Sequence, residues 1–155
     1  MDMFLVVVSC GSQKIWDKYP SAGPTPARDV YTSSVFKASC RYAAHFAKRW
    51  VILSAKYGFI DPDFIISENY NRSFYDRGAI SIAELKMQVG AARLTDFDLL
   101  GVVGSEIYWD RVARAFEGSG LRVRPINGNV GFPPLFHRLI RDLIEKNTPF
   151  ALPVP

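Results

Sequence analysis

The amino-acid sequence predicts a three-layer α/β fold, with a mostly parallel central sheet and helices on both faces. Short apolar runs of strand length alternate along the chain with amphipathic stretches of helical period, which is typical of successive β-α-β units. The chain has 155 residues, 48% of them hydrophobic, so it is long enough to bury the core of one domain. We expect a single α/β domain over residues 1–148 and an irregular tail over 149–155.

Four apolar runs predict the strands. The second run is continuous and apolar, as expected of a strand that is covered on both faces. The runs lie at residues 3–9, 50–53, 99–103 and 121–126. A loop rich in Gly, Pro and Ser follows the first run to about Ala27, and the irregular segment 55–80 is expected to fold over one edge of the sheet.

Four amphipathic segments predict the helices. Thr32 or Ser33 can cap the first helix, and Pro133 suits the first turn of the last. Ser81 and Glu84 have the spacing of a capping box at the start of the second helix. Apolar residues recur in these segments at spacings of three and four, which puts them on one face, toward the sheet. The expected helices span 33–49, 81–94, 106–117 and 133–146.

Composition and charge indicate a cytoplasmic protein with an anionic partner. The net charge of +4 and the pI near 9.2 favour nucleic acid or nucleotides. The two cysteines do not form the dense pattern of a secreted disulfide scaffold, which favours a reducing compartment. The first apolar run is too short for an export signal, and no run approaches the roughly 20 residues of a membrane span. We therefore expect no membrane contact.

A ligand site is expected where the parallel strands end. In open α/β sheets, ligands bind outside the carboxyl ends of the strands, at the point where the strand order reverses. The residues directly after the strands are small, polar or glycine, which lets backbone amides approach a ligand, and two groups lead into helix N-termini that favour anions. With residues before the first helix that can reach the same edge, the predicted ligand-binding residues are Gly11, Ser12, Arg28, Tyr31, Ser33, Ser54, Lys56, Gly58, Gly104, Ser105, Asn127 and Gly131.

Four side chains are candidates for catalysis. Cys10 ends the first strand and Lys14 follows four residues later, so a nearby ammonium favours the thiolate and makes the sulfur a nucleophile. The alternative is that Cys10 is a small buried hydrophobe and Lys14 a solvated charge. Tyr57 or Asp29 can handle a proton, although Asp29 can equally serve as a turn or cap residue. Cys40 lies on the apolar stripe of a helix and is expected in the core.

We expect neither a metal nor a cofactor. His45 and His137 have no cysteine or carboxylate partner at metal-ligand spacing, so surface or packing roles are expected for both. The sequence has no P-loop, no dinucleotide-binding fingerprint and no serine-hydrolase elbow. The stretch Asn127–Gly131 is only a weak signal for a phosphate-binding loop.

Three stretches of the chain carry a resemblance to a known family. They are Ser9–Lys14, Arg28–Ser33 with Phe36, and Ile52–Asp63 with the later Tyr70. In this order and spacing the chain resembles the small uncharacterised bacterial, archaeal and phage proteins related to the peroxide-stress protein YaaA. The resemblance implies a three-layer α/β domain associated with nucleic acid.

A fainter similarity involves Cys10, Lys14 and the stretch Tyr31–Ser33. These residues are similar to a signature in the catalytic domain of archaeosine synthase, which attaches lysine to a nitrile-bearing deazaguanine in transfer RNA. The segment between Lys14 and Tyr31 is longer here than in that signature, and no Ser-x-Ser-His run follows. This similarity implies action on a modified base.

Three functional hypotheses follow from these observations. The first is an enzyme acting on a nucleobase or nucleotide, by base modification, glycosidic-bond or transfer chemistry, with Cys10 or Lys14 attacking the base or the glycosidic carbon. The second is a non-catalytic DNA- or RNA-binding protein of YaaA-like type, and the third is an enzyme or sensor of free nucleotides. In the second, phosphates are bound by Lys14, Lys18, Arg28, Lys56 and Arg72, and bases stack on Trp16, Tyr19 or Tyr57.

Overall fold

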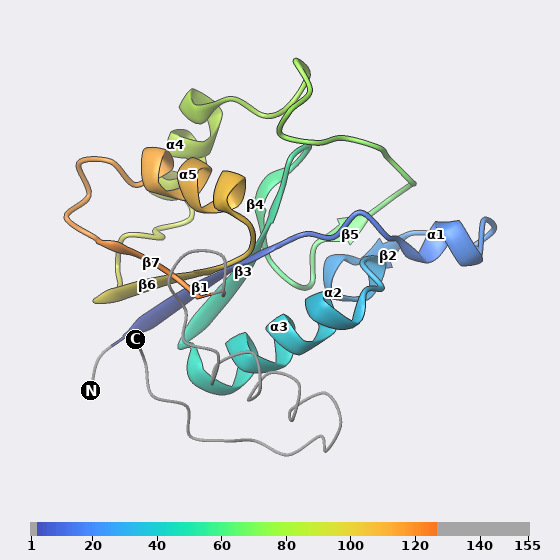
Figure 1. The fold of residues 1–155 in the computed structure, drawn as a ribbon, viewed down its shortest axis with the longest axis horizontal. Coiled ribbons are helices and arrows are strands. Elements are labelled where there is room, and N and C mark those ends of the chain that lie inside the picture. The colour runs from blue at the N-terminus through green and yellow to red at the C-terminus, as the bar shows by residue number, and fades with distance from the viewer. Residues whose placement is uncertain (1–2, 127–155) are drawn as a thin grey trace.

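The structure is a computed structural model that describes residues 3–126, and it has an α/β fold around a five-stranded sheet (Figure 1). The strand order is β4-β3-β1-β6-β7. Strands β3, β1, β6 and β7 are parallel, whereas β4 runs antiparallel to β3 at the edge. The strands span Phe4–Ser9 (β1), Arg49–Ser54 (β3), Gly58–Ile60 (β4), Leu99–Val103 (β6) and Val123–Pro125 (β7).

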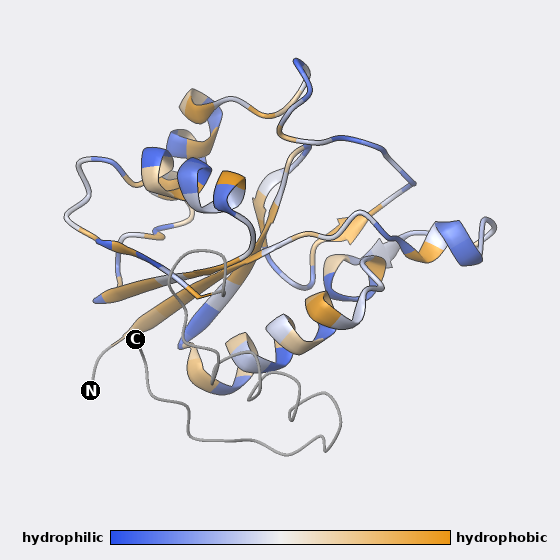
Figure 2. Ribbon diagram, in the orientation of Figure 1, coloured by the Kyte–Doolittle hydropathy of each residue, from blue (hydrophilic) through white to orange (hydrophobic). Residues whose placement is uncertain are grey.

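The central strands are apolar on both faces because helices cover both faces of the sheet. Strand β1 pairs Val7 with Val51 of β3 and with Val102 of β6. Alternate residues of β1 enter two separate hydrophobic clusters, Val6 on one face and Val7 on the other. Figure 2 shows the result: the central strands are mainly hydrophobic, while the helices also carry hydrophilic residues.

Helices α3 (Ser34–Phe46), α4 (Ile82–Ala91) and α5 (Glu106–Ala115) form the outer layers. Helix α3 packs on the face of Val6, and α4 and α5 pack on the face of Val7. The caps expected from the sequence are present at two of them. The Ser33 hydroxyl accepts a hydrogen bond from Phe36 N at 3.1 Å, and the Ser81 hydroxyl accepts one from Glu84 N at 3.1 Å.

Two segments that were expected to be irregular contain regular structure. The loop to Ala27 includes α1 (Ile15–Lys18) and the start of α2 (Ala27–Val30), and its strand β2 (Thr25–Pro26) pairs with β5 (Ile65–Ile66) in a second, two-stranded sheet. These elements are two to four residues long, too short to produce a period in the sequence. The segment 55–80 adds the edge strand β4 as well as folding over the sheet.

The turn into β4 depends on Gly58 and Gln88. Gly58 has φ 77°, a left-handed conformation that favours glycine, so the chain can reverse directly after β3. The side-chain amide of Gln88 then covers the outer edge of β4, accepting from Phe59 N at 2.8 Å and donating to Tyr57 O at 2.9 Å. Because these contacts are tertiary, local sequence patterns do not reveal them.

The other differences from the sequence prediction are at element ends. The strand at 99–103 and the positions of the three described helices are confirmed, but α3 ends at Phe46, α4 at Ala91 and α5 at Ala115. The strand predicted at 121–126 spans Val123–Pro125. The predicted helix 133–146 and the tail 149–155 lie outside the described residues. Across residues 3–126, no helix is both long enough and apolar enough to cross a membrane.

Candidate functional site

The candidate site lies where the chain leaves β1 and β6 toward opposite faces of the sheet. Helix α3 covers one face and α5 the other, so the ends of these neighbouring strands form the topological switch point at which ligands bind in such folds. Cys10 directly follows β1, and its N–H donates to Leu53 O at 3.1 Å. At the end of β6, a Cβ on Gly104 would come within 2.6 Å of Ser9. Glycine there lets the two strand ends approach each other.

Close to the carboxyl ends of these strands, three hydroxyl groups are hydrogen-bonded in a chain with Tyr70 at its centre. The Tyr70 hydroxyl lies 2.9 Å from Ser54 Oγ and is also hydrogen-bonded to the Tyr31 hydroxyl. Ser54 and Tyr31 are fully buried. The sulfur of Cys10 lies 3.4 Å from the hydroxyl of Tyr108, which projects from the first turn of α5. Residues from five distant parts of the chain therefore meet at one place.

Ser54 also shapes the turn between β3 and β4. Its Oγ accepts hydrogen bonds from Lys56 N and Tyr57 N, both at 3.2 Å. This arrangement, typical of a serine turn, brings the Lys56 and Tyr57 side chains to Tyr70. The rings of Tyr57 and Tyr70 meet edge to face with centroids 5.4 Å apart.

Two lysines converge on the Tyr70 ring. The Lys14 ammonium lies 4.5 Å from the ring centroid, and the Lys56 ammonium lies 5.5 Å from it. Lys14 is only 7% exposed, and Nζ donates to Ser12 O at 3.4 Å. Within residues 3–126, neither ammonium has a carboxylate at ion-pair distance. Because a buried charge is costly unless it is paired, this arrangement suits an anionic ligand.

The Cys10 thiol is neutral in the folded protein. Burial raises its pKa above the ordinary value of 9.0, while Tyr108, the backbone at Ala55, Lys14 and Tyr70 act in the opposite direction. The charge of Lys14 therefore acts as the sequence analysis expected, but burial outweighs it. Burial also raises the pKa of Tyr70, to about 12. The thiol and the phenols around it are thus uncharged near pH 7.

Six of the predicted site residues come together. Lys14 is buried rather than solvated, and Tyr31 reaches the cluster through Tyr70. The six residues that the structure brings together are Cys10, Lys14, Tyr31, Ser54, Lys56 and Tyr57. With Tyr70 and Tyr108 they form what we call the Cys10 cluster.

Other predicted residues have contacts elsewhere or lie on the surface. Arg28 and Asp29 lie exposed on α2, where the Arg28 guanidinium forms ion pairs with Asp63 and Asp29. Ser33 caps α3, and a Cβ on Gly11 would lie 3.4 Å from its hydroxyl. The remaining positions are Gly58 in its turn, Gly104 between strand ends, exposed Ser12 and Ser105, and Asn127 and Gly131 outside the described residues.

The sequence analysis did not assign Tyr70 or Tyr108 to the site. Tyr108 lies in the helix predicted at 106–117, and it packs against the core. Its position in the first turn of α5, directly after a strand, was the signal that its hydroxyl would reach the strand ends. Tyr70 follows β5 in a segment without period, so no local pattern predicts where its ring lies.

An open recess of about 690 Å³ lies beside the Cys10 cluster rather than over Cys10. Tyr57, a member of the cluster through its contact with Tyr70, also lines this recess. The recess is lined by residues of β3, β4 and the loop that follows β4, and its aromatic side chains are Trp50, Tyr57, Phe59 and Phe64. It adjoins the cluster, but the reactive groups of the cluster do not line it.

Cysteine, histidine and acidic side chains do not form a metal site among residues 3–126. His45 is exposed and its ring contacts Phe46, with centroids 4.5 Å apart. Both cysteines are free thiols, and Cys40 is half-buried against the core, as expected from its helical stripe.

Fold and site define an α/β protein with a thiol, hydroxyl and lysine cluster at the carboxyl edge of its sheet. Residues 5–127 match the family of unknown function DUF6884, and the chain belongs to that family. It is also 35% identical over 146 residues to the uncharacterized protein YfjM of Bacillus subtilis (strain 168), covering 92% of this chain and 97% of YfjM. No solved structure matches the chain.

Proposed function

We propose that the protein is a cytoplasmic enzyme that acts on a nucleobase or nucleotide, with the Cys10 cluster as its active site. One observation carries this proposal: Lys14 and Lys56 converge on the Tyr70 ring beside a thiol, without a carboxylate partner in the described chain. Two ammonium groups and aromatic rings in one place are the groups that bind phosphate and a base.

Each part of the cluster has a role in this proposal. Lys14 and Lys56 bind the phosphate, and the half-buried ring of Tyr57 stacks on the base. The sulfur of Cys10 forms a bond to a carbon of the substrate as the bond from that carbon to the leaving group breaks, and the thiol proton passes through the Tyr108 hydroxyl to the leaving group. A water molecule then displaces the sulfur from that carbon and returns a proton to the thiol. Tyr70 holds Ser54 and Tyr31 in place through its hydroxyl.

A second candidate function is a non-catalytic DNA- or RNA-binding protein. The observation that favours it is the raised pKa of Cys10, which leaves the sulfur as a neutral thiol rather than a thiolate. The family and the relative that match this chain are of unknown function, so they favour neither candidate. In the binding function, the same lysines contact phosphates and Cys10 is a packing residue.

Mass spectrometry of possible substrates distinguishes the two candidates. Nucleosides, nucleotides, DNA and transfer RNA are incubated with the wild type, with Cys10→Ala and with Cys40→Ala, and each pool is analysed for altered or released bases. The enzyme proposal predicts a product that Cys40→Ala still forms and that Cys10→Ala forms at least about 10³-fold more slowly.

Lys56→Ala and Lys48→Ala complete the experiment as a matched pair. Lys48 is exposed at the other end of the strands, where its backbone N–H donates to Phe4 O at the start of β1. Its substitution therefore controls for the loss of one positive charge. Lys56→Ala should weaken substrate binding and Lys48→Ala should not. Absence of any product from the wild type, together with salt-sensitive binding of nucleic acid, would contradict the enzyme proposal and favour the binding function.

A further inference from the structure

The segment from Asn71 to Gly78, which we call the Tyr75 loop, presents an exposed aromatic ring near the Cys10 cluster. Tyr75 is 83% exposed, more than any other large apolar side chain among residues 3–126. The segment between β5 and α4 rises in green above the sheet in Figure 1. A single exposed aromatic side chain is common on protein surfaces, so the order of the loop, its contact with the site and the charge around it carry the argument.

Hydrogen bonds within the Tyr75 loop hold this exposed position. Ser73 N donates to Asp76 Oδ2 at 2.8 Å, Asp76 N donates to Ser73 O at 3.0 Å, and Tyr75 N donates to Ser73 Oγ at 3.2 Å. The Arg72 guanidinium donates to Gly78 O across the loop. Since the backbone is already ordered, a ligand that binds Tyr75 loses less free energy to loop ordering.

Phe74 attaches the loop to the wall of the site. Its buried ring meets the ring of Tyr108 edge to face, with centroids 5.2 Å apart. The hydroxyl of the same Tyr108 lies 3.4 Å from Cys10 Sγ. A single aromatic contact therefore links the loop to Tyr108, the residue that touches the thiol. Tyr75 directly follows Phe74 in the chain.

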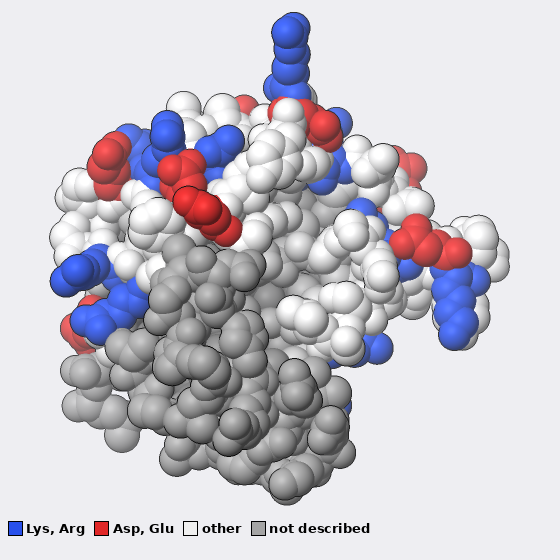
Figure 3. Space-filling view, viewed as in Figure 1, with Lys and Arg blue, Asp and Glu red and all other residues white. Residues whose placement is uncertain are grey.

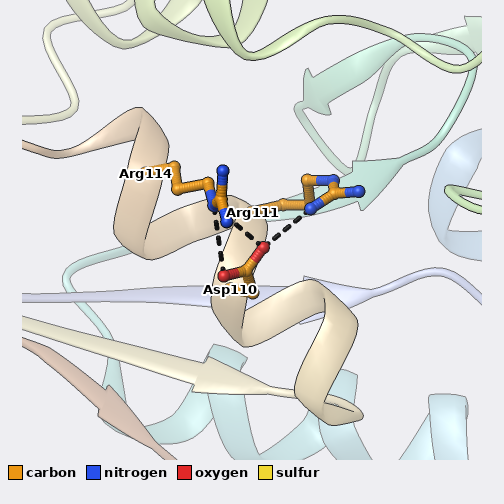
Figure 4. Close-up of polar contacts among 3 residues, drawn as sticks. All are labelled: Asp110, Arg111 and Arg114. Carbon is orange, nitrogen blue, oxygen red and sulfur yellow. Dashed lines mark hydrogen bonds and ion pairs between the residues drawn. The ribbon is translucent and has the colours of Figure 1, made fainter.

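The charge around Phe74 and Tyr75 suits phosphate groups. Arg72 and Arg77 outnumber Asp76, whose carboxylate is bonded to Ser73 N within the loop. Arg111 lies 5.7 Å from the Phe74 ring centroid. As Figure 4 shows, Arg111 and Arg114 share the carboxylate of Asp110, which can neutralise only one of them. In Figure 3, basic and acidic side chains are interspersed over the upper part of the molecule.

We infer that the Tyr75 loop binds a single strand of nucleic acid that passes over the Cys10 cluster. This inference rests on the proposed function and names its substrate class: a nucleotide within an unpaired strand. The Tyr75 ring stacks on the base next to the one in the cluster, and Arg77 contacts the strand backbone. A duplex does not fit this role, because its bases are already stacked on both faces and offer no free face to Tyr75.

Binding measurements on four proteins test the inference. Fluorescence anisotropy follows a short labelled single strand of mixed sequence, as DNA and as RNA, and its duplex form, while calorimetry follows mononucleotides. The proteins are the wild type, Tyr75→Ala, Tyr75→Phe and Met87→Ala, which alters another exposed side chain, 74% exposed on α4. All four should unfold at the same temperature, since both positions are exposed.

We expect the single strand to bind more tightly than either the duplex or the mononucleotides. Tyr75→Ala should weaken strand binding about 5- to 150-fold and leave mononucleotide binding unchanged, because it removes one stacked base. Tyr75→Phe and Met87→Ala should bind as the wild type does.

Two results would overturn the inference, and they have different consequences. If Tyr75→Ala binds single strands like the wild type, or if the duplex or the mononucleotides bind as tightly as the strand, the loop has no stacking role and the proposed site stands. If neither mononucleotides nor strands bind the wild type, the proposed function fails together with the inference.

Discussion

The two cysteines of the chain are both half-buried, yet the groups around them differ. Burial raises the pKa of each thiol, that of Cys40 to about 12. At Cys40 the carboxylate of Asp29 adds to this effect. At Cys10 two hydroxyls, a backbone group and Lys14 oppose it. The difference teaches that position in the fold decides which groups act on a thiol pKa. At the strand end, several polar groups lower the pKa of Cys10, whereas on the apolar helical stripe burial and Asp29 both raise that of Cys40.

Alkaline pH should produce the largest effect on these two regions. Burial is the first cause of a raised pKa at Cys10, Tyr31, Tyr70 and Tyr108 in the cluster, and at Cys40 and Tyr42 on α3. The unfolded chain, with ordinary values of 9.0 for cysteine and 10.0 for tyrosine, releases these protons first. Their stabilisation is therefore complete below about pH 9 and is lost as the pH rises toward 12.

Urea unfolding between pH 7 and 11 measures this loss. Each group contributes up to about 1.4 kcal/mol per pH unit in the window where only the unfolded chain is ionised. Tyr70→Phe, which removes one cluster group, should flatten the fall in the free energy of unfolding, and so should Tyr42→Phe on α3. A free energy of unfolding that stays constant from pH 8 to 11 would show that these groups are not buried as described.

Two buried serines give the next largest contrast. Ser54→Ala removes the acceptor for Lys56 N and Tyr57 N and the partner of Tyr70, which should cost about 2–3 kcal/mol in the free energy of unfolding. Ser39, beside Cys40, donates only to Val35 O within α3. Ser39→Ala should cost about 1 kcal/mol or less, because alanine favours the helix. Equal costs in urea unfolding would contradict the central position of Ser54.

Removal of one phenol hydroxyl is a smaller change. Tyr70→Phe keeps the ring under Lys14 but leaves the buried hydroxyl of Tyr31 without this partner, so we expect a loss of about 1–2 kcal/mol at pH 7. Tyr75→Phe removes a hydroxyl from an exposed ring and should change the stability by less than about 0.5 kcal/mol. Thermal unfolding of both variants measures the difference, and a Tyr70→Phe protein as stable as the wild type would count against the hydroxyl chain.

The smallest effect concerns Lys14 and the reactivity of Cys10. Lys14→Met removes one of the weaker influences that lower the pKa of Cys10, so alkylation of this thiol by iodoacetamide at pH 9 should slow by a few-fold, roughly 2- to 5-fold. The alkylation rate of Cys40 in the same protein should not change. Faster alkylation of Cys10 would mean that the variant has opened the site.

Sequence patterns were sufficient for β1, β3 and β6 because these strands are mostly buried, and for α3 and α4 because serine caps mark where they begin. They were insufficient for β4, where Gln88 covers the strand edge from another helix. In the site, Cys10 and Ser54 could be placed because each follows a strand directly. Tyr70 could not, because its position depends on the path of an irregular segment. Arg28 has contacts with Asp63 instead of the cluster, a pairing between segments that the sequence does not reveal.

Protection of Cys10 by ligands tests the central claim most directly. The alkylation rates of Cys10 and Cys40 are measured in one sample by peptide mass spectrometry at pH 9, with and without mononucleotides and with and without single-stranded oligonucleotides. If nucleotides bind at the Cys10 cluster, Cys10 is alkylated more slowly in their presence while the rate at Cys40, the internal reference, stays the same. Unchanged rates at both cysteines with every ligand would contradict a nucleotide site at Cys10.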